Sequence, residues 1–195
     1  EILVECGCPP GVFNLVMGRG SVIGPSLVND ARVMALSFTG SVGTGQNLLR
    51  VAAERNLKLQ LEMGGKNGTI VLADADLEVA VRACIEAAFL STGQRCTATS
   101  RVIVERKIRA EFTERFLRGA DALRVGHALD KETQVGPVAS ESQLRTNLEY
   151  VAIAAKEGAQ VHGGEVLERP TKGYFQRPAV FLEARNDMRS SREEI

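Results

Sequence analysis

The sequence predicts an α/β protein built on parallel β-strands. Short runs of β-branched and aromatic residues alternate along the chain with longer segments of helical periodicity, a pattern typical of β-α-β units. Glycine-rich turns occur where an expected strand gives way to an expected helix, as in residues 39–45. The 195 residues, 44% of them hydrophobic, suffice for one large domain or two small ones with packed cores.

The first part of the chain contains three expected strands and two expected helices. We expect strands at 12–16, 32–38 and 58–62 and helices at 23–29 and 46–54. A Pro-Pro-Gly turn at 9–11 precedes the first strand. The glycine-rich stretch 63–68 then interrupts the pattern, and we place a domain boundary there, between residues 64 and 65.

The second part opens with a strand and a largely apolar helix. We expect a strand at 69–72, a helix at 77–90, a polar loop at 91–100 and a strand at 101–105. Asp74 or Asp76 caps the helix. This helix is apolar nearly all round and should therefore be buried, with Cys84 as a small core residue.

Two further helices and two β-like runs complete the chain. One helix is amphipathic, and its apolar face comprises Ile108, Phe112, Phe116 and Leu123. The other opens with a capping box of Ser140 and Gln143 and is closed by Gly158. The β-like runs lie around Val161 and at 180–182. We expect His162 in an exposed turn.

Composition and charge exclude several classes of function. The 24 basic and 24 acidic side chains cancel, which argues against binding nucleic acid or a membrane surface, because both need a basic field. No apolar run reaches the roughly 18 residues of a membrane span, and no secretory leader is recognisable. The sequence starts without methionine and ends abruptly at residues 191–195, without a polar tail. We therefore expect it to be an internal piece of a longer protein.

The cysteines indicate a cytoplasmic protein with reduced thiols. The chain has four of them, Cys6, Cys8, Cys84 and Cys96, too few and too scattered for a disulfide scaffold. Only two histidines accompany them, His127 and His162, and no second cysteine pair follows the first, so we expect no metal site.

Two glycine motifs lie where a strand gives way to a helix, the place at which backbone amides can hold a pyrophosphate. The motifs are Gly18-x-Gly20-x-x-x-Gly24 and Gly40-x-x-Gly43-x-Gly45, and neither has the spacing of the dinucleotide-binding fingerprint. From spacing alone, an ordinary tight turn explains them equally well.

Cys96 and Glu62 are candidates for chemistry, each with a plainer alternative. Cys96 lies in a polar loop after Gly93, which permits a sharp turn, and beside Arg95, which can help to hold a thiolate. No histidine is nearby to act as its base, so a papain-type pair is not favoured. Glu62 ends an alternating strand directly before two glycines and can serve as a general base if burial raises its pKa. The alternatives are an incidental thiol and a solvated charge.

Taken together and in order, these motifs resemble those of the aldehyde dehydrogenase superfamily. The resemblance rests on Phe38-Thr39-Gly40-Ser41-x-x-x-Gly45, Leu61-Glu62-Met63-Gly64-Gly65-Lys66-Asn67, Gly93-Gln94-Arg95-Cys96 and Glu193-Glu194-Ile195. It runs the whole chain, including Pro9-Pro10-Gly11-Val12-Phe13-Asn14 and Gln134-Val135-Gly136-Pro137.

The resemblance implies a role for each matching residue. Cys96 matches the nucleophile that forms a thiohemiacetal and then a thioester, with hydride passing to NAD or NADP. Glu62 matches the general base that activates water. Gly40, Ser41 and Gly45 match the turn that lies against the cofactor pyrophosphate, and Glu194 matches the carboxylate that binds the nicotinamide ribose. The backbone amide of Cys96 would supply one oxyanion donor.

The resemblance also implies the domain organisation. Residues 1–64 correspond to the C-terminal half of a Rossmann-like NAD(P)-binding domain, and 65–195 to the N-terminal part of an α/β catalytic domain. The family's oxyanion asparagine, its cofactor lysine and its assembly strand match nothing in this chain, so we expect the chain alone to be inactive or unstable. The whole protein would be a homodimer or homotetramer that acts on a small aldehyde.

The substrate and the reaction class each leave alternatives. Residues 91–97 resemble the branch that oxidises α-ketoglutaric semialdehyde, and Arg95 beside the nucleophile can pair with a substrate carboxylate, or else point to protein or solvent. Two other functions are possible for this fold. In a CoA-acylating enzyme, CoA and not water takes the thioester, so the presence of the water-activating Glu62 argues against it. A non-catalytic member of the fold needs neither Glu62 nor Cys96, so the presence of both residues argues against it.

Overall fold

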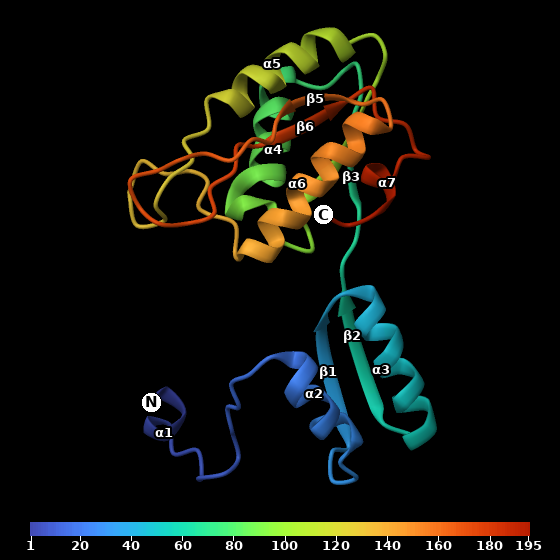
Figure 1. Cartoon of the computed structure of the whole chain (residues 1–195), viewed down its shortest axis with the longest axis vertical. Helices are drawn as coiled ribbons and strands as arrows, with labels where there is room; N and C mark the ends of the chain where they lie inside the picture. The colour runs from blue at the N-terminus through green and yellow to red at the C-terminus, as the bar shows by residue number, and fades with distance from the viewer. The chain divides into compact units, whose positions relative to one another are not determined.

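Parallel strand pairs lie at the centre of each of two separate parts of the chain, which confirms the prediction of an α/β protein with parallel strands. A computed structural model describes all 195 residues and divides them into two compact units, Glu1–Met63 and Gly64–Ile195 (Figure 1). None of the helices combines the length and the hydropathy needed to cross a bilayer.

The first unit holds one parallel pair of strands covered by helix α3. Its elements are α1 (Ile2–Glu5), α2 (Gly20–Asn29), β1 (Ala35–Gly40), α3 (Val42–Arg55) and β2 (Lys58–Met63). Strand alternation turns Leu36 of β1 and Leu59 of β2 toward the helices, where they pack against the buried Val28, Ala52 and Leu57. The alternate residues of both strands are exposed on the opposite face.

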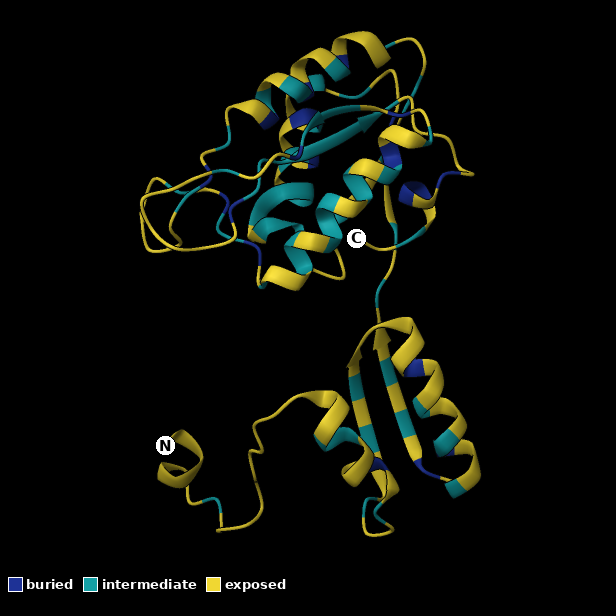
Figure 2. Cartoon of the chain, viewed as in Figure 1, coloured by how far each residue is buried: buried dark blue, intermediate teal, exposed yellow.

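The expected strand at 12–16 is wrong. The segment has no regular secondary structure, and Val12, Phe13, Leu15 and Val16 are all more than 60% exposed (Figure 2). A strand is stabilised by the hydrogen bonds and side chains of a neighbouring strand, and no strand of this chain pairs with the segment. Local β-propensity alone therefore does not order it.

The second unit combines a parallel pair with an antiparallel pair. Its elements are β3 (Asn67–Val71), α4 (Leu77–Phe89), the 3₁₀ helix η1 (Leu90–Gly93), β4 (Thr99–Val104), α5 (Arg109–Asp121), α6 (Glu141–Lys156), β5 (Gln160–Gly163), β6 (Ala179–Leu182) and α7 (Arg189–Arg192). Strands β3 and β4 are parallel, whereas β5 and β6 are antiparallel.

The caps of this unit are partly as expected. Asp76, not Asp74, caps α4 by accepting from the amides of Glu78 and Val79, and Ser140 caps α6. Ile108 and Leu123 fall just outside α5, although Phe112 and Phe116 are buried on its apolar face.

Two expectations for the second unit need correction. Helix α4 is only partly buried: Val81 and Cys84 are in the core, but Val79 is 49% exposed, and the three charged side chains of the helix are exposed as well. Burial raises the pKa of the Cys84 thiol, as suits a core residue. His162 does not lie in a turn. It belongs to β5, and its Nε2 lies 2.8 Å from an Asp121 carboxylate oxygen, a pairing that its neighbours in sequence do not reveal.

Candidate functional site

The turn from β1 to α3 contains three of the predicted residues. Gly40 ends β1, and Ser41 caps α3 by accepting a hydrogen bond of 3.3 Å from the Thr44 amide. Gly45 is buried in the first turns of α3, where a Cβ atom would collide with the Met63 thioether. A Cβ atom at Gly43 would meet nothing. The helix therefore begins in a turn with small residues and an open approach to its first amides.

Glu62 lies at the same end of the strand pair as this turn. Thr39 pairs with Glu62 and Gly40 with Met63, because the two strands are parallel and their carboxyl ends coincide. Alternation places Glu62 on the exposed face of the pair, opposite the face that α3 covers. The first unit thus brings Glu62 close to Gly40 and Ser41, which precede it by 22 and 21 positions in the sequence.

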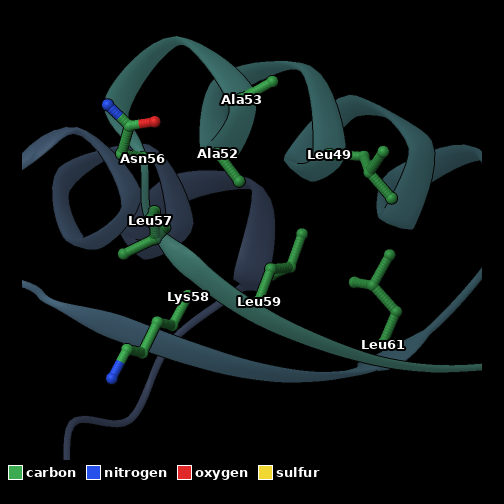
Figure 3. A pocket seen from close by; sticks show the side chains of 8 residues that line it. All are labelled: Leu49, Ala52, Ala53, Asn56, Leu57, Lys58, Leu59 and Leu61. Carbon is green, nitrogen blue, oxygen red and sulfur yellow. The ribbon is translucent and has the colours of Figure 1, made fainter.

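A hollow of about 610 Å³ lies elsewhere in the first unit, between α3 and β2 (Figure 3). Its lining is mainly aliphatic and includes Leu49, Leu59 and Leu61, whose side chains point into the space between helix and strand. None of the predicted site residues lines it. The hollow is therefore a gap in apolar packing and not the site of the predicted chemistry.

In the second unit, Cys96 is exposed on a loop that follows an unusual turn. Ser91, Thr92 and Gly93 all have left-handed backbone angles, with φ of +57°, +56° and +66°. A Cβ atom at Gly93 would lie 2.7 Å from the Ala88 carbonyl oxygen, so only glycine fits there. The two non-glycine residues carry backbone strain, which persists only where the surroundings hold it in place.

Contacts from three other segments hold this loop. The Gln94 side-chain carbonyl accepts from the Ala139 amide at 2.9 Å, and its amide group donates to the Thr92 hydroxyl. Arg95 donates to the Ala87 carbonyl at 3.3 Å. The amide of Cys96 itself donates to no backbone group of the chain. The loop is thus fixed on both sides of a thiol that stays accessible.

Asn67 provides the third contact, directly on the residue that carries the thiol. Its side-chain amide donates to the Cys96 carbonyl at 2.6 Å and to the Ala98 carbonyl at 3.3 Å. Asn67 begins β3, four residues after Met63, the last residue of the first unit.

Glu194 meets the same stretch of chain. Its carboxylate lies so close to Gly64 that a Cβ atom there would collide with it. Lys66 is half-buried nearby: burial and the Arg101 guanidinium lower the pKa of Lys66 to about 8, although Glu194 and Glu193 act in the opposite direction. The segment 64–67 therefore contacts both Glu194 and the Cys96 loop.

The residue before Glu194 is held by helix α6. The Glu193 carboxylate accepts from the Tyr150 hydroxyl at 2.5 Å and from Arg189 at 2.9 Å. Hydrogen bonds from Arg189 and then Tyr150 lower the pKa of Glu193 to about 2. The same bond to Glu193 raises the pKa of Tyr150. Glu193 is thus ionised at neutral pH and fixes the chain that leads to Glu194.

The structure groups the predicted residues in two sets. Gly40, Ser41, Gly45 and Glu62 belong to the first unit, and Arg95, Cys96 and Glu194 belong to the second. Sequence reasoning did not single out Asn67, Gln94 or Lys66. The only sequence signal for these three residues was their position inside the motifs at 61–67 and 93–96.

Comparisons with known proteins agree over the whole chain. The model of the aldehyde dehydrogenase family matches residues 1–195. A betaine aldehyde dehydrogenase of Cereibacter sphaeroides is 45% identical over all of this chain, and an alpha-ketoglutaric semialdehyde dehydrogenase of Bacillus subtilis is 45% identical over 98% of it. The chain spans 40% of the length of each.

A solved structure has the same fold. An aldehyde dehydrogenase from Bacillus cereus in complex with NAD+ is 39% identical and superposes with a TM-score of 0.93, over 97% of this chain and 38% of that one. The chain therefore belongs to the aldehyde dehydrogenase family. Its two equally similar relatives are named for different aldehydes.

Proposed function

We propose that this chain carries the nucleophile, the general base and part of the cofactor site of an NAD(P)-dependent aldehyde dehydrogenase. Residues 1–64 would form the C-terminal half of the cofactor domain, and 65–195 the first part of the catalytic domain. One observation supports the proposal above the others: the segment 64–67, which begins two residues after Glu62, contacts both the Cys96 loop and Glu194.

The turn from β1 to α3 fits a cofactor pyrophosphate. The Ser41 side chain accepts from the Thr44 amide, so the earlier amides of α3, at Val42 and Gly43, are free to donate to a bound group. They lie at the positive end of the dipole of a 14-residue helix, which favours a negatively charged acceptor. The absence of a side chain at Gly43 leaves the approach to these amides open, whereas the Phe38 ring already occupies the place of a Cβ atom at Gly40. Glu194 would hold the nicotinamide ribose through its carboxylate oxygens. When bound, NAD(P)+ supplies the acceptor for a hydride.

Cys96 would act as the nucleophile. Its thiolate adds to the aldehyde carbon, a C–S bond forms, and the carbonyl oxygen becomes an alkoxide, toward which the Cys96 amide can donate. The carbon then loses its hydrogen as hydride, and the alkoxide electrons re-form the C=O bond of a thioester. The exposed loop gives substrate access to the sulfur.

Glu62 would complete the cycle as general base. Its carboxylate takes a proton from water, the water oxygen adds to the thioester carbon, and the C–S bond breaks to release a carboxylic acid and the Cys96 thiolate. A carboxylate on an exposed strand face, next to a glycine-rich stretch, has room for this water. A CoA-acylating enzyme would not need this base, and a non-catalytic member would need neither residue.

For the substrate we propose an acidic semialdehyde, with Arg95 as its partner. Arg95 is exposed beside Cys96 and uses one nitrogen to donate to Ala87, which leaves other donors of the guanidinium for a carboxylate. The relatives named for betaine aldehyde and alpha-ketoglutaric semialdehyde are equally similar to this chain, so similarity does not choose between them. The charge of the aldehyde that the whole protein prefers is therefore the property to test. Arg95→Ala in the whole protein should lower kcat/KM about 10-fold or more for an acidic aldehyde and spare a neutral one. A loss confined to the neutral aldehyde contradicts the assignment.

The experiment that tests the reaction is thioester trapping in the whole protein. With Glu62→Gln we expect a stoichiometric burst of NAD(P)H and an acyl adduct on Cys96, detected by mass spectrometry. Cys96→Ser should abolish both, while Cys6→Ser, which changes another exposed thiol, should leave them intact. A burst that survives Cys96→Ser would disprove the assignment of the nucleophile.

The 195-residue chain alone should show no turnover, since it spans 40% of the length of its relatives. For the whole protein we propose a homodimer or homotetramer and a choice of NAD or NADP made by residues outside this chain. Light scattering and steady-state rates with each cofactor test these points.

A further inference from the structure

We propose that Asn67 is a positioning residue for the Cys96 nucleophile: its side-chain amide fixes the peptide groups on the carboxyl side of the thiol, and thereby the direction in which the sulfur leaves the backbone. The inference rests on the proposed function of Cys96 but concerns a residue to which that function assigns no role. Asn67 acts on the reaction only through Cys96.

The two hydrogen bonds of Asn67 are the first support. One amide nitrogen donates to the Cys96 carbonyl at 2.6 Å and to the Ala98 carbonyl at 3.3 Å. A side-chain amide has two N–H bonds, so it can serve both acceptors at once. The two carbonyls also determine which way the Asn67 amide group is turned. In the flipped orientation its oxygen would face two carbonyl oxygens, and no hydrogen bond could form. The bonds join residues 29 and 31 positions apart in the chain.

The strand register explains why Asn67 reaches this loop. Asn67 pairs with Thr99, but Gly68 pairs with Arg101, so Ser100 is an extra residue on β4. Such a bulge bends its strand and re-aims the neighbouring side chains. The Ser100 hydroxyl donates to the Asn67 carbonyl at 3.4 Å, which ties both sides of the bulge together.

The other contacts of the loop hold it mainly on the amino side of Cys96. Gln94 and Arg95 anchor the loop before Cys96, through Ala139 and Ala87. After Cys96, the remaining backbone bond is from the Ala98 amide to the Arg95 carbonyl, within the turn itself. Asn67 is therefore the contact that ties the carboxyl side of the turn to the strand pair.

Fixing the Cys96 carbonyl fixes the peptide plane next to the Cys96 Cα atom, and with it the direction of the Cα–Cβ bond. A nucleophile needs this direction within a narrow range, and a displacement of about 1 Å can cost about 100-fold in rate. The Cys96 amide, as oxyanion donor, is equally sensitive because it acts only when it points at the developing charge. This amide belongs to the peptide group on the other side of the Cα atom, where Gln94 and Arg95 anchor the loop. Asn67 therefore completes the hold on the residue that carries both groups.

The test is Asn67→Asp in the whole protein. The change keeps the shape of the side chain but replaces both N–H donors by a carboxylate oxygen that faces the Cys96 and Ala98 carbonyls. We expect kcat for aldehyde oxidation to fall about 10- to 100-fold, with the KM for NAD(P)+ unchanged. The rate of Cys96 alkylation by iodoacetamide should fall as well. Asn67→Ser, which retains one hydroxyl donor, should restore part of both rates.

Asn147→Asp is the matched control. Asn147 is also an asparagine of the second unit and donates to the Gln176 side chain at 2.9 Å, so the same substitution removes a comparable bond. We expect it to lower thermal stability as Asn67→Asp does, but to leave kcat and the alkylation rate within twofold of the unchanged protein. A merely structural role for Asn67 would make the two variants alike.

The proposal is overturned if Asn67→Asp retains kcat and the alkylation rate within twofold. If Asn67→Asp does not fold, Asn67→Ser and its alkylation rate decide in the same way. A whole protein that oxidises no aldehyde would disprove the proposed function, whereas alkylation of Cys96 would still show whether Asn67 controls the thiol.

Discussion

The turn at Gly40–Gly45 and the turn at Ser91–Cys96 are built in different ways. The first joins a strand to a helix, and its geometry comes from its own residues: Ser41 is an ordinary N-cap with extended backbone angles, bonded three residues ahead. The second leaves a helix through three consecutive left-handed residues, two of which are not glycine. Contacts from Asn67 and Ala139, both distant in sequence, and from Ala87 in the preceding helix hold it.

The comparison shows what each turn can supply. A locally determined turn presents backbone amides in a standard arrangement, which suits a phosphate group that many helices can bind. A turn held from several sides can keep a single reactive atom in an otherwise unfavourable place. Changes in the second turn should therefore cost more than changes in the first.

Gly93→Ala should have the largest effect. The added Cβ atom would lie 2.7 Å from the Ala88 carbonyl oxygen at a residue with φ of +66°. We expect a loss of about 1–3 kcal/mol in the free energy of unfolding and a fall in kcat of about 100-fold. Chemical denaturation and steady-state kinetics of the whole protein measure both.

Gly20→Ala is the control for this change. Gly20 is the first residue of helix α2, where a Cβ atom would meet nothing beyond its chain neighbours. The same substitution should there change the free energy of unfolding by less than about 0.5 kcal/mol and leave kcat unchanged. If both alanine variants behaved alike, the distinction between the two turns would be lost.

Ser41→Ala should have a smaller effect, confined to the first turn. Loss of the bond to the Thr44 amide should cost about 1 kcal/mol in the free energy of unfolding. Ser140→Ala removes the corresponding cap of α6 and should cost a similar amount. Isothermal titration with NAD(P)+ separates the two, because only Ser41→Ala should weaken cofactor binding. Equal binding by both variants would count against the cofactor site at this turn.

Lys66 should make stability depend on alkaline pH. Its pKa is lowered to about 8, mainly by burial, from 10.5 in the unfolded chain. Below pH 8 both states hold the proton and the cost of burying the charge is present in full. Between pH 8 and 10.5 the folded state releases its proton first, so stability rises with pH. Because the side chain is only half-buried, we expect less than about 1 kcal/mol.

Lys66→Met removes this dependence. Urea denaturation at pH 7 and pH 10 should show a difference in the unchanged protein that the variant lacks. Lys156→Met, a change at an exposed lysine near the end of α6, should keep the difference. The assignment would fail if Lys66→Met retained the same rise.

The smallest effect concerns Glu193. Its pKa is lowered to about 2 from 4.5, by Arg189 and then Tyr150, so its contribution is present above pH 4.5 and is lost as pH falls through 2. Tyr150→Phe removes one donor and should raise the pKa of Glu193, measured by carbon-13 NMR of the carboxylate. Tyr174→Phe, at the only other tyrosine, should not change it. An unchanged pKa in Tyr150→Phe would mean that Arg189 alone sets it.

The sequence predicted most of the elements because their signals are local. Hydrophobic periodicity places strands β1 to β6 and the longer helices, and Ser140 and Asp76 mark helix starts through residues three or fewer positions away. The expected strand at 12–16 is wrong because strand formation depends on a partner. His162 was misplaced for the same reason: it lies in a strand because it pairs with Val180 of β6, 18 positions further on.

By itself the sequence determined the family, the α/β class and the identity of the candidate residues, because their types and order are written along the chain. Only the tertiary structure decided which of them meet. It placed Glu62 opposite Thr39, one residue before Gly40, through the parallel register, Glu194 against Gly64, and Asn67 on the Cys96 carbonyl. These contacts depend on strand register and on hydrogen bonds between distant segments, which no local pattern of residues encodes.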